Sequence, residues 1–227
     1  MKTIKHITAF LLIIITLNSY SQDTTYYSVL DVTVTDMEKN VSPGDKIFFE
    51  SKKTGKIYSG ISDKDGKFKI KLPNGSVYQI KIKSFDQDMN YTAVDIVEAD
   101  YDMEFEIGIS YELPKTYTLK DVHFDTNKAT LKSGSFKSLN ELAEFMIHKT
   151  TLKIELAGHT DSDGEADMNL DLSQRRAETV RNYLIKKGVA SNRLTAKGYG
   201  ETKALATNST DECKQLNRRT EVRILEQ

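Results

Sequence analysis

The 227-residue sequence has no excess of charge of either sign, because 32 Lys and Arg residues stand against 33 Asp and Glu residues. Proteins that bind nucleic acid through its phosphates carry a basic excess, so we expect no nucleic-acid partner. Cysteine is nearly absent as well. The single residue, Cys213, cannot form an internal disulfide. We expect a shielded thiol, with an intermolecular disulfide as the alternative in an oxidising compartment.

Long apolar runs are missing except for Ile7 to Leu17, which follows Lys2 and Lys5 and precedes Ser19-Tyr20-Ser21. A basic start, a short apolar run and small residues two positions apart are typical of a secretory signal peptide. We therefore expect residues 1–21 to be removed and the chain to be exported. An uncleaved anchor is the alternative, but the run is shorter than the ~20 residues that span a bilayer. No cysteine follows it, so the usual lipoprotein acylation site is missing.

Patterns typical of catalysis are also missing. No Ser-His-Asp or Cys-His arrangement for a nucleophile stands out. His123 and His159 lack the close spacing of metal ligands, which favours a structural role. Asp161, Asp163 and Glu165 could suggest the acid pair of a glycosidase, but three acids on a polar loop are more often solvated. We expect a non-enzyme without metal or cofactor.

Residues 22–112 show strand periodicity and no helical run. Apolar and polar residues alternate in several short segments, which indicates half-buried strands. The alternating apolar residues are Val29, Val32 and Val34; Ile47 and Phe49; Phe68, Ile70 and Leu72; Tyr78, Ile80 and Ile82; and Phe105, Ile107 and Ile109. The turns between them are Ser42-Pro43-Gly44-Asp45, Lys53-Thr54-Gly55-Lys56, Asp63-Lys64-Asp65-Gly66 and Pro73-Asn74-Gly75. Short strands with regular turns predict a small all-β sandwich.

The turn from Asp63 to Gly66 lacks the ligand spacing of a calcium loop and predicts a hairpin. The stretch from Asp65-Gly66-Lys67-Phe68 through Pro73-Asn74-Gly75 to Tyr78 resembles the transthyretin-like or carboxypeptidase-regulatory-like sandwich modules of exported bacterial proteins. The weaker resemblance extends over residues 29–110. It implies a spacer or interaction module that carries no chemistry.

Pro114 marks a boundary, after which strands alternate with helices through residues 113–227. This alternation predicts a two-layer domain with mixed α and β elements. The expected strands are 117–124, 152–156, one beginning at 193–197 and 220–225, and the expected helices are 135–149 and about 169–187. A loop of about twenty residues is expected before the last strand.

The segment from Gly158 to Arg176 connects an expected strand to an expected helix. Asp161 and Arg176 are fifteen residues apart, and a strand-loop-helix turn can bring them to opposite walls of one pocket. One fixed negative and one fixed positive charge suit a ligand end that carries both an ammonium and a carboxylate. Asn169 lies two helical turns before Arg176, near a helix start whose free N–H groups favour a carboxylate.

Each of these residues also has a simpler interpretation. Asp161 could cap its own loop. Arg176 could form a salt bridge with Glu178 or near Asp171.

Four motifs in order then identify a family resemblance. Residues 118–225 resemble the OmpA-like peptidoglycan-binding domain, which Pal-type lipoproteins and flagellar motor stators share. The motifs are Phe124-Asp125-Thr126-Asn127-Lys128-Ala129-Thr130-Leu131; the ungapped run from Gly158-His159-Thr160-Asp161 to Gly188; Arg193-Leu194 with Gly198-Tyr199-Gly200-Glu201; and Asn217-Arg218-Arg219-Thr220-Glu221. Departures from the family pattern are Ala204 for its proline and Glu212-Cys213-Lys214 before the last motif.

The resemblance implies a βαβαββ fold that holds the peptide stem of peptidoglycan without covalent chemistry. In the family, Asp161 and Arg176 would clamp the ammonium and carboxylate of diaminopimelate. Asn127, Asn169 and Arg218, in preference to Arg219, would line the same pocket.

The expected protein is a periplasmic one of a diderm bacterium, associated with the outer membrane and the cell wall, that tethers the envelope to the wall. Its sandwich would be a spacer or would face an envelope partner. The alternative is an adhesion or structural envelope protein whose sandwich carries the main interaction while the wall domain localises it.

Overall fold

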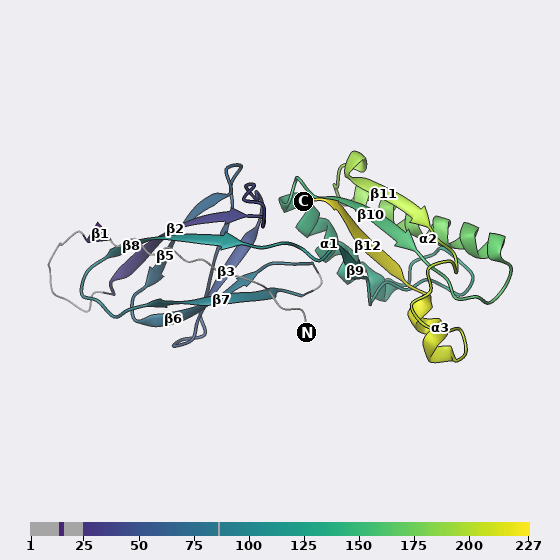
Figure 1. Cartoon of the computed structure of the whole chain (residues 1–227), viewed down its shortest axis with the longest axis horizontal. Coiled ribbons are helices and arrows are strands. Elements are labelled where there is room, and N and C mark those ends of the chain that lie inside the picture. Colours follow the sequence, from purple (N-terminus) through teal and green to yellow (C-terminus); the bar gives the residue numbers. More distant parts are fainter. Residues whose placement is uncertain (1–13, 16–24, 86) are drawn as a thin grey trace. The chain divides into compact units, whose positions relative to one another are not determined.

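The computed structural model describes residues 14–15, 25–85 and 87–227, and the chain divides into two compact units, Met1–Glu112 and Leu113–Gln227 (Figure 1). Of the predicted signal peptide only Ile14–Ile15 is described, and the expected cleavage position lies outside the described residues. Within the described ranges no helix has both the length and the apolar character needed to cross a membrane.

The N-terminal unit consists of two four-stranded sheets with strand orders β1-β8-β2-β5 and β4-β3-β6-β7 (Figure 1). β2 and β8 pair in parallel, and the other neighbouring strands are antiparallel. The bounds are β1 (Ile14–Ile15), β2 (Tyr27–Thr35), β3 (Lys46–Ser51), β4 (Ile57–Ile61), β5 (Lys67–Pro73), β6 (Ser76–Ile82), β7 (Met89–Ile96) and β8 (Met103–Ser110).

Alternating burial along these strands builds the core of the unit. β3 alternates strictly between half-buried and buried residues, as the period-two pattern predicts. The prediction is wrong for Val29, which is half-buried, because the buried apolar residues of β2 are Leu30, Val32 and Val34. Phe49 on β3 meets Phe68 on β5 edge to face, with ring centroids 6.5 Å apart, so the two sheets share their apolar contacts.

Each of the four predicted turns contains a glycine with a positive φ, namely Gly44, Gly55, Gly66 and Gly75. The turn that ends at Gly66 is a hairpin, as predicted. The Asp63 carboxylate accepts hydrogen bonds from the N–H groups of Asp65 and Lys67, both at 2.9 Å.

The C-terminal unit has one four-stranded sheet, in the order β11-β10-β12-β9, and three α-helices (Figure 1). β10 and β11 are parallel, while β12 is antiparallel to both of its neighbours, β10 and β9. The bounds are β9 (Thr116–Thr118), η1 (Ser133–Ser135), α1 (Phe136–His148), β10 (Lys153–Gly158), α2 (Ala166–Lys186), η2 (Ser191–Arg193), β11 (Leu194–Gly198), α3 (Asp211–Asn217) and β12 (Thr220–Glu226).

The expectation of an α+β domain agrees with this unit, but three details of the expected βαβαββ order are wrong. The first strand ends at Thr118, because the chain turns there and the N–H of Val122 bonds to the carbonyl of Leu119. α2 begins at Ala166 and not near Asn169, whose N–H already donates to the carbonyl of Glu165. The expected loop before the last strand contains α3.

The helix α3 begins where Thr210 caps it. The Thr210 side chain accepts a hydrogen bond from the N–H of Cys213, and Asp211 and Glu212 lie in the first turn, where acidic side chains favour a helix start. Cys213 is a half-buried free cysteine on this helix. These caps were present in the sequence, but a seven-residue helix has too little apolar periodicity to be predicted from it.

Candidate functional site

The sheet topology brings the ends of four strands to one edge of the C-terminal sheet. β9 and β10 both run antiparallel to β12, and β10 runs parallel to β11, so the carboxyl ends of β9, β10 and β11 lie at the edge where β12 begins. Ligand sites of open sheets with parallel strands commonly lie outside the carboxyl ends of the strands. Asp161 follows β10 at this edge, and Arg218 precedes β12.

Two glycines allow α2 to lie directly against the strand ends. A Cβ atom on Gly158 would lie 2.2 Å from the carbonyl oxygen of Ser173, and one on Gly198 would lie 2.5 Å from the backbone nitrogen of Gln174. Side chains then fasten the helix to the strand ends. The Ser173 hydroxyl accepts from the N–H of Gly200 at 2.9 Å, and the Gln174 side chain accepts from the N–H of Gly198 at 2.7 Å. These contacts fix the position of α2, and therefore of Arg176, relative to this edge of the sheet.

A cleft of about 460 Å³ opens at this edge, and all five residues predicted to bind the ligand line it: Asn127, Asp161, Asn169, Arg176 and Arg218. His123, His159, Lys132, Asp163 and Gln215 are also among its lining residues. The structure therefore brings Asn127 and Arg218, which are 91 positions apart in the sequence, into one cleft.

The Asp161 side chain is nearly buried, and both its oxygens have partners. Oδ1 accepts from the N–H of Asp163 at 3.2 Å, and Oδ2 forms a short ion pair with the guanidinium of Arg218. The loop-cap interpretation is thus correct for one oxygen. The other oxygen is held by a cation 57 residues away in the sequence.

Arg176 has no carboxylate partner among the residues that the structure describes. Its Nε donates to the carbonyl oxygen of Lys128 at 3.0 Å, and its guanidinium carbon lies 5.1 Å from the centre of the Phe124 ring. Burial lowers the pKa of Arg176, and the charge of Asp161 only partly offsets this. The guanidinium stays protonated at neutral pH.

The alternative salt bridges proposed for Arg176 are not formed, because their acids have other partners. Asp171 pairs with Arg175 at 2.8 Å, and Glu178 accepts a hydrogen bond from Gln174. Arg176 is therefore a partly desolvated cation. Within the described part of the chain, no acidic side chain forms an ion pair with it.

The two asparagines have different environments. The side-chain amide of Asn169 is buried and donates to the carbonyl of Asp163 at 3.1 Å and to Glu201 at 2.8 Å, so it fastens the loop that carries Asp161. The expected role of its backbone N–H is wrong, because that group is already bonded within α2. Asn127 is exposed and has φ +56°, a left-handed conformation that asparagine tolerates.

The adjacent arginines of the last motif point to different partners. Arg218 reaches Asp161 in the cleft. Arg219 is buried, and its guanidinium lies 2.7 Å from Glu221 and donates to the carbonyl of Lys203. Both arginines line the cleft, but only Arg218 pairs with Asp161.

His159 belongs to the buried support beneath the cleft. Its ring stacks on Tyr199 at a centroid distance of 5.3 Å, and its Nε2 lies 3.4 Å from Glu221. Burial, together with the charge of Arg219, lowers the pKa of His159 to about 4, so the ring is neutral at neutral pH. In the described ranges no cluster of three or more His, Cys, Asp or Glu side chains could hold a metal ion.

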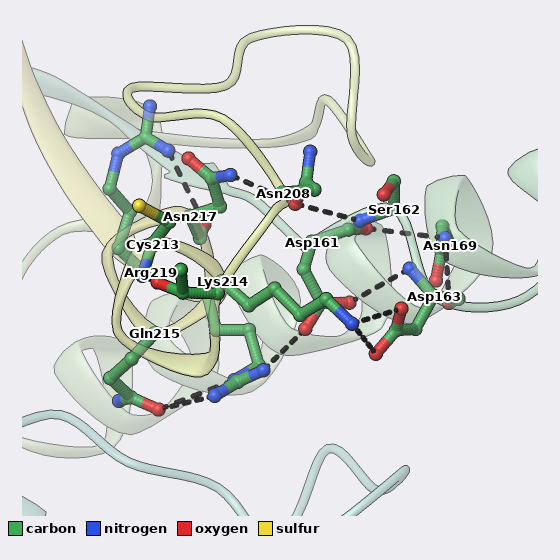
Figure 2. A network of polar contacts seen from close by, with 12 residues as sticks. Asp161, Ser162, Asp163, Asn169, Asn208, Cys213, Lys214, Gln215, Asn217 and Arg219 are labelled. Atoms are coloured by element: carbon green, nitrogen blue, oxygen red, sulfur yellow. Dashed lines mark hydrogen bonds and ion pairs between the residues drawn. The ribbon is translucent and has the colours of Figure 1, made fainter.

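The sequence analysis missed the contribution of α3. Figure 2 shows Lys214 extending from this helix to Asp163, with Nζ to oxygen distances of 2.8 and 3.0 Å. Asn217 binds Asn208, which in turn accepts from the N–H of Ser162 at 3.2 Å. The segment 208–218 thus closes over the acidic loop and neutralises two of its carboxylates. Lys214 follows the cap at Thr210 and the acidic first turn of Asp211 and Glu212, which were the signals in the sequence for this helix.

Fold and site together define a small α+β domain with a polar, charged cleft at one sheet edge. Residues 123–218 match the OmpA family and form an OmpA family domain. The outer membrane porin F of Pseudomonas fluorescens is 44% identical over 104 residues, which are 46% of this chain and 32% of the porin. The chain thus spans about a third of the length of that relative.

For two further relatives, the match to this chain covers more of the relative's length. The peptidoglycan-associated lipoprotein of Buchnera aphidicola is 29% identical over 172 residues, 75% of this chain and 96% of the lipoprotein. The crystal structure of the peptidoglycan-associated lipoprotein from Burkholderia pseudomallei is 25% identical, covers 49% of this chain and 91% of that chain, and has a TM-score of 0.43.

Proposed function

We propose that the C-terminal unit binds the peptide stem of peptidoglycan non-covalently, through the end of diaminopimelate that carries an ammonium and a carboxylate. The observation that carries this proposal is Arg176, a half-buried guanidinium in the cleft that donates to backbone carbonyls and forms no ion pair with a described carboxylate, with Asp161 lining the same cleft. A ligand carboxylate on Arg176 would replace the missing counter-charge, and guanidinium geometry suits such a contact.

The expected affinity follows from a few strong contacts. Each hydrogen bond to a charged group contributes about 1.5–3 kcal/mol where water is excluded. Several such bonds, less the cost of association, give binding in roughly the micromolar range. Asn127 and Arg218 are the further proposed ligand contacts, and Asn169 supports the loop of Asp161.

The proposed setting is the periplasm, next to the outer membrane and the wall, where binding would tether the envelope without any enzymatic step. The names of the relatives support it, since they describe an outer membrane porin and a peptidoglycan-associated lipoprotein. The proposed organisation is a signal peptide over residues 1–21, a β-sandwich spacer or interaction module over 22–112 and the wall-binding domain over 113–227.

Co-sedimentation of the chain lacking residues 1–21 with purified sacculi tests the proposal. We expect the wild type to pellet with sacculi, Arg176→Ala to remain in the supernatant and Asp161→Ala to pellet less than the wild type. Arg175→Ala and Asp171→Ala are matched controls, because they remove the same chemistry from an exposed ion pair on the same helix. Equal pelleting of Arg176→Ala and Arg175→Ala would contradict the proposal, and release of soluble muropeptides would indicate an enzyme instead.

A second candidate function rests on the N-terminal unit. A cleft of about 480 Å³ lies among its β3–β4 turn, its β5–β6 turn and the segment after β7, with Tyr58, Tyr78, Lys53 and Glu98 among its lining residues. Loops at the end of such a scaffold often carry binding residues. This cleft favours the alternative in which the sandwich makes the main envelope interaction and the wall domain localises it.

Site-specific photo-crosslinking in cells tests the second candidate. A crosslinking amino acid at Tyr58 should trap one envelope protein of defined mass, and the same group at Lys69, which points to solvent from β5, should not. Identical patterns from both positions would leave the N-terminal unit as a spacer.

A further inference from the structure

The ion pairs at the cleft leave a positive excess. The cations Lys132, Arg176, Arg218 and Arg219 and the anions Asp161 and Asp163 line it. The four cations and two anions of the lining leave an excess of two positive charges. Outside the lining, Glu221 pairs with Arg219 and Arg223, and Lys214 pairs with Asp163. Lys132 and Arg176 are the two without an ion pair among the described residues.

The two charged ends of a zwitterionic ligand consequently meet different environments. An ammonium that approaches Asp161 finds a carboxylate already bonded to Arg218, and it must share or displace that guanidinium. A carboxylate that approaches Arg176 meets a cation bonded only to backbone carbonyls. An ammonium that displaces Arg218 also releases a further cation toward the ligand.

We propose that the cleft selects stems by their free carboxylates and depends much less on the ligand ammonium. The preferred ligand is net anionic, and amidation of a stem carboxylate releases it, whereas acylation of the amine is tolerated. Lys132 becomes an additional ligand contact that supplies part of this selectivity. The proposal rests on the proposed wall-binding function of the same site.

The physical reason is the difference in what each end replaces. A carboxylate adds a counter-charge that the half-buried guanidinium of Arg176 lacks, and removal from water without a partner is costly for a charged group. An ammonium exchanges one cation for another beside Asp161, so its net gain is smaller. Wall stems that carry amidated acids would therefore be poor ligands, and stems whose amine is consumed in a crosslink would still bind.

Isothermal titration with three synthetic probes tests the selectivity. The probes are the tripeptide L-alanyl-γ-D-glutamyl-meso-diaminopimelate, the same peptide with the side-chain carboxylate of diaminopimelate amidated, and the same peptide with its side-chain amine acetylated. We expect amidation to weaken binding by about tenfold or more, the loss of one charge-assisted contact, and acetylation to weaken it by less than about threefold.

The outcomes separate the two proposals. If no probe binds, the wall-binding function fails. If the parent tripeptide binds and acetylation costs as much as amidation, the function stands and the selectivity proposal is overturned.

The variants Lys132→Ala and Arg218→Ala add an internal check. Lys132→Ala should weaken the parent peptide while it lowers the penalty for amidation. Arg218→Ala should raise the penalty for acetylation. Asp161 then lacks its arginine, so the ligand ammonium becomes its counter-charge and contributes more to binding. A penalty for acetylation that does not change in Arg218→Ala would contradict the assigned role of the Asp161–Arg218 pair.

Discussion

Replacing Gly158 by alanine tests whether the contact between β10 and α2 sets the geometry of the cleft. The new Cβ would lie 2.2 Å from the carbonyl oxygen of Ser173 and 3.0 Å from its carbonyl carbon. Ordinary contact requires more than 3.4 Å for most such pairs, so one element has to move by about 1 Å. The obstacle is backbone, and a change of side-chain rotamer cannot relieve it.

The magnitude follows from what resists the movement. The hydrogen bonds of Ser173 and Gln174 to the strand-end N–H groups of Gly200 and Gly198 tie α2 to this position. Overpacking in a well-packed core costs typically about 1–3 kcal/mol. The gain in backbone rigidity from glycine to alanine offsets about 0.4–1 kcal/mol. A net loss of about 1–2 kcal/mol lowers the melting temperature of a unit of this size by roughly 3–12 °C.

Thermal unfolding and sacculus co-sedimentation of the same preparation measure the two consequences. Gly134→Ala is the control, because no atom lies within 4 Å of a Cβ there and its φ is not positive. We expect Gly158→Ala to melt lower and, below its melting temperature, to bind sacculi more weakly, since Arg176 follows Ser173 by less than one turn. The reasoning is refuted if Gly158→Ala and Gly134→Ala melt and bind alike.

Three further predictions concern charge. The free energy of unfolding should fall by at most about 3 kcal/mol as the pH drops from about 6.5 toward 4. The reason is that the unfolded chain protonates His159 in this range, while burial keeps the pKa of His159 in the folded protein at about 4. Urea titrations at each pH measure this slope, and His159→Gln should flatten it. Lys214→Ala should weaken sacculus binding with little change in melting temperature, because it leaves the Asp163 carboxylate unneutralised beside the cleft, and unchanged binding would contradict this. Arg219→Ala should destabilise the domain by about 1.5–3 kcal/mol, because it removes one of the two arginines that pair with the buried Glu221 carboxylate, while Arg223 remains. Arg175→Ala, which breaks an exposed ion pair, is the control, and similar unfolding curves for the two variants would refute the assignment.

Local patterns were sufficient for much of the fold. Alternation over short segments marked the strands with one buried face, such as β3 and β6, and glycine at the turns marked their ends. Strands without such a pattern were not identified. β4 exposes Ile57 and Ile61, and in β7 the alternation breaks where the apolar residues Ala93 and Val94 are adjacent, so neither shows a full period-two pattern. Their strand state depends on pairing with neighbours.

Asp161 and Arg176 could be identified from the sequence because they belong to one strand-loop-helix connection, Asp161 in the loop and Arg176 in the helix. Their partners could not. Arg218 and Lys214 lie more than 50 residues after the acids that they neutralise, and only the sheet order brings β12 and α3 beside β10. Asn169 illustrates the same limit, since its position in α2 was predicted and its buried contact with Glu201 was not.

The sequence by itself thus determined much of the alternation of elements. It also predicted an export signal and a zwitterionic ligand end for the pair of opposite charges. Only the tertiary structure decided which of those charges are already neutralised. Periodicity and capping act over a few residues and can be read along the chain, whereas ion pairing and desolvation depend on distances between segments that the chain order does not specify. For this cleft, that difference assigns Asp161 to Arg218 and leaves Arg176 without an ion pair among the described residues.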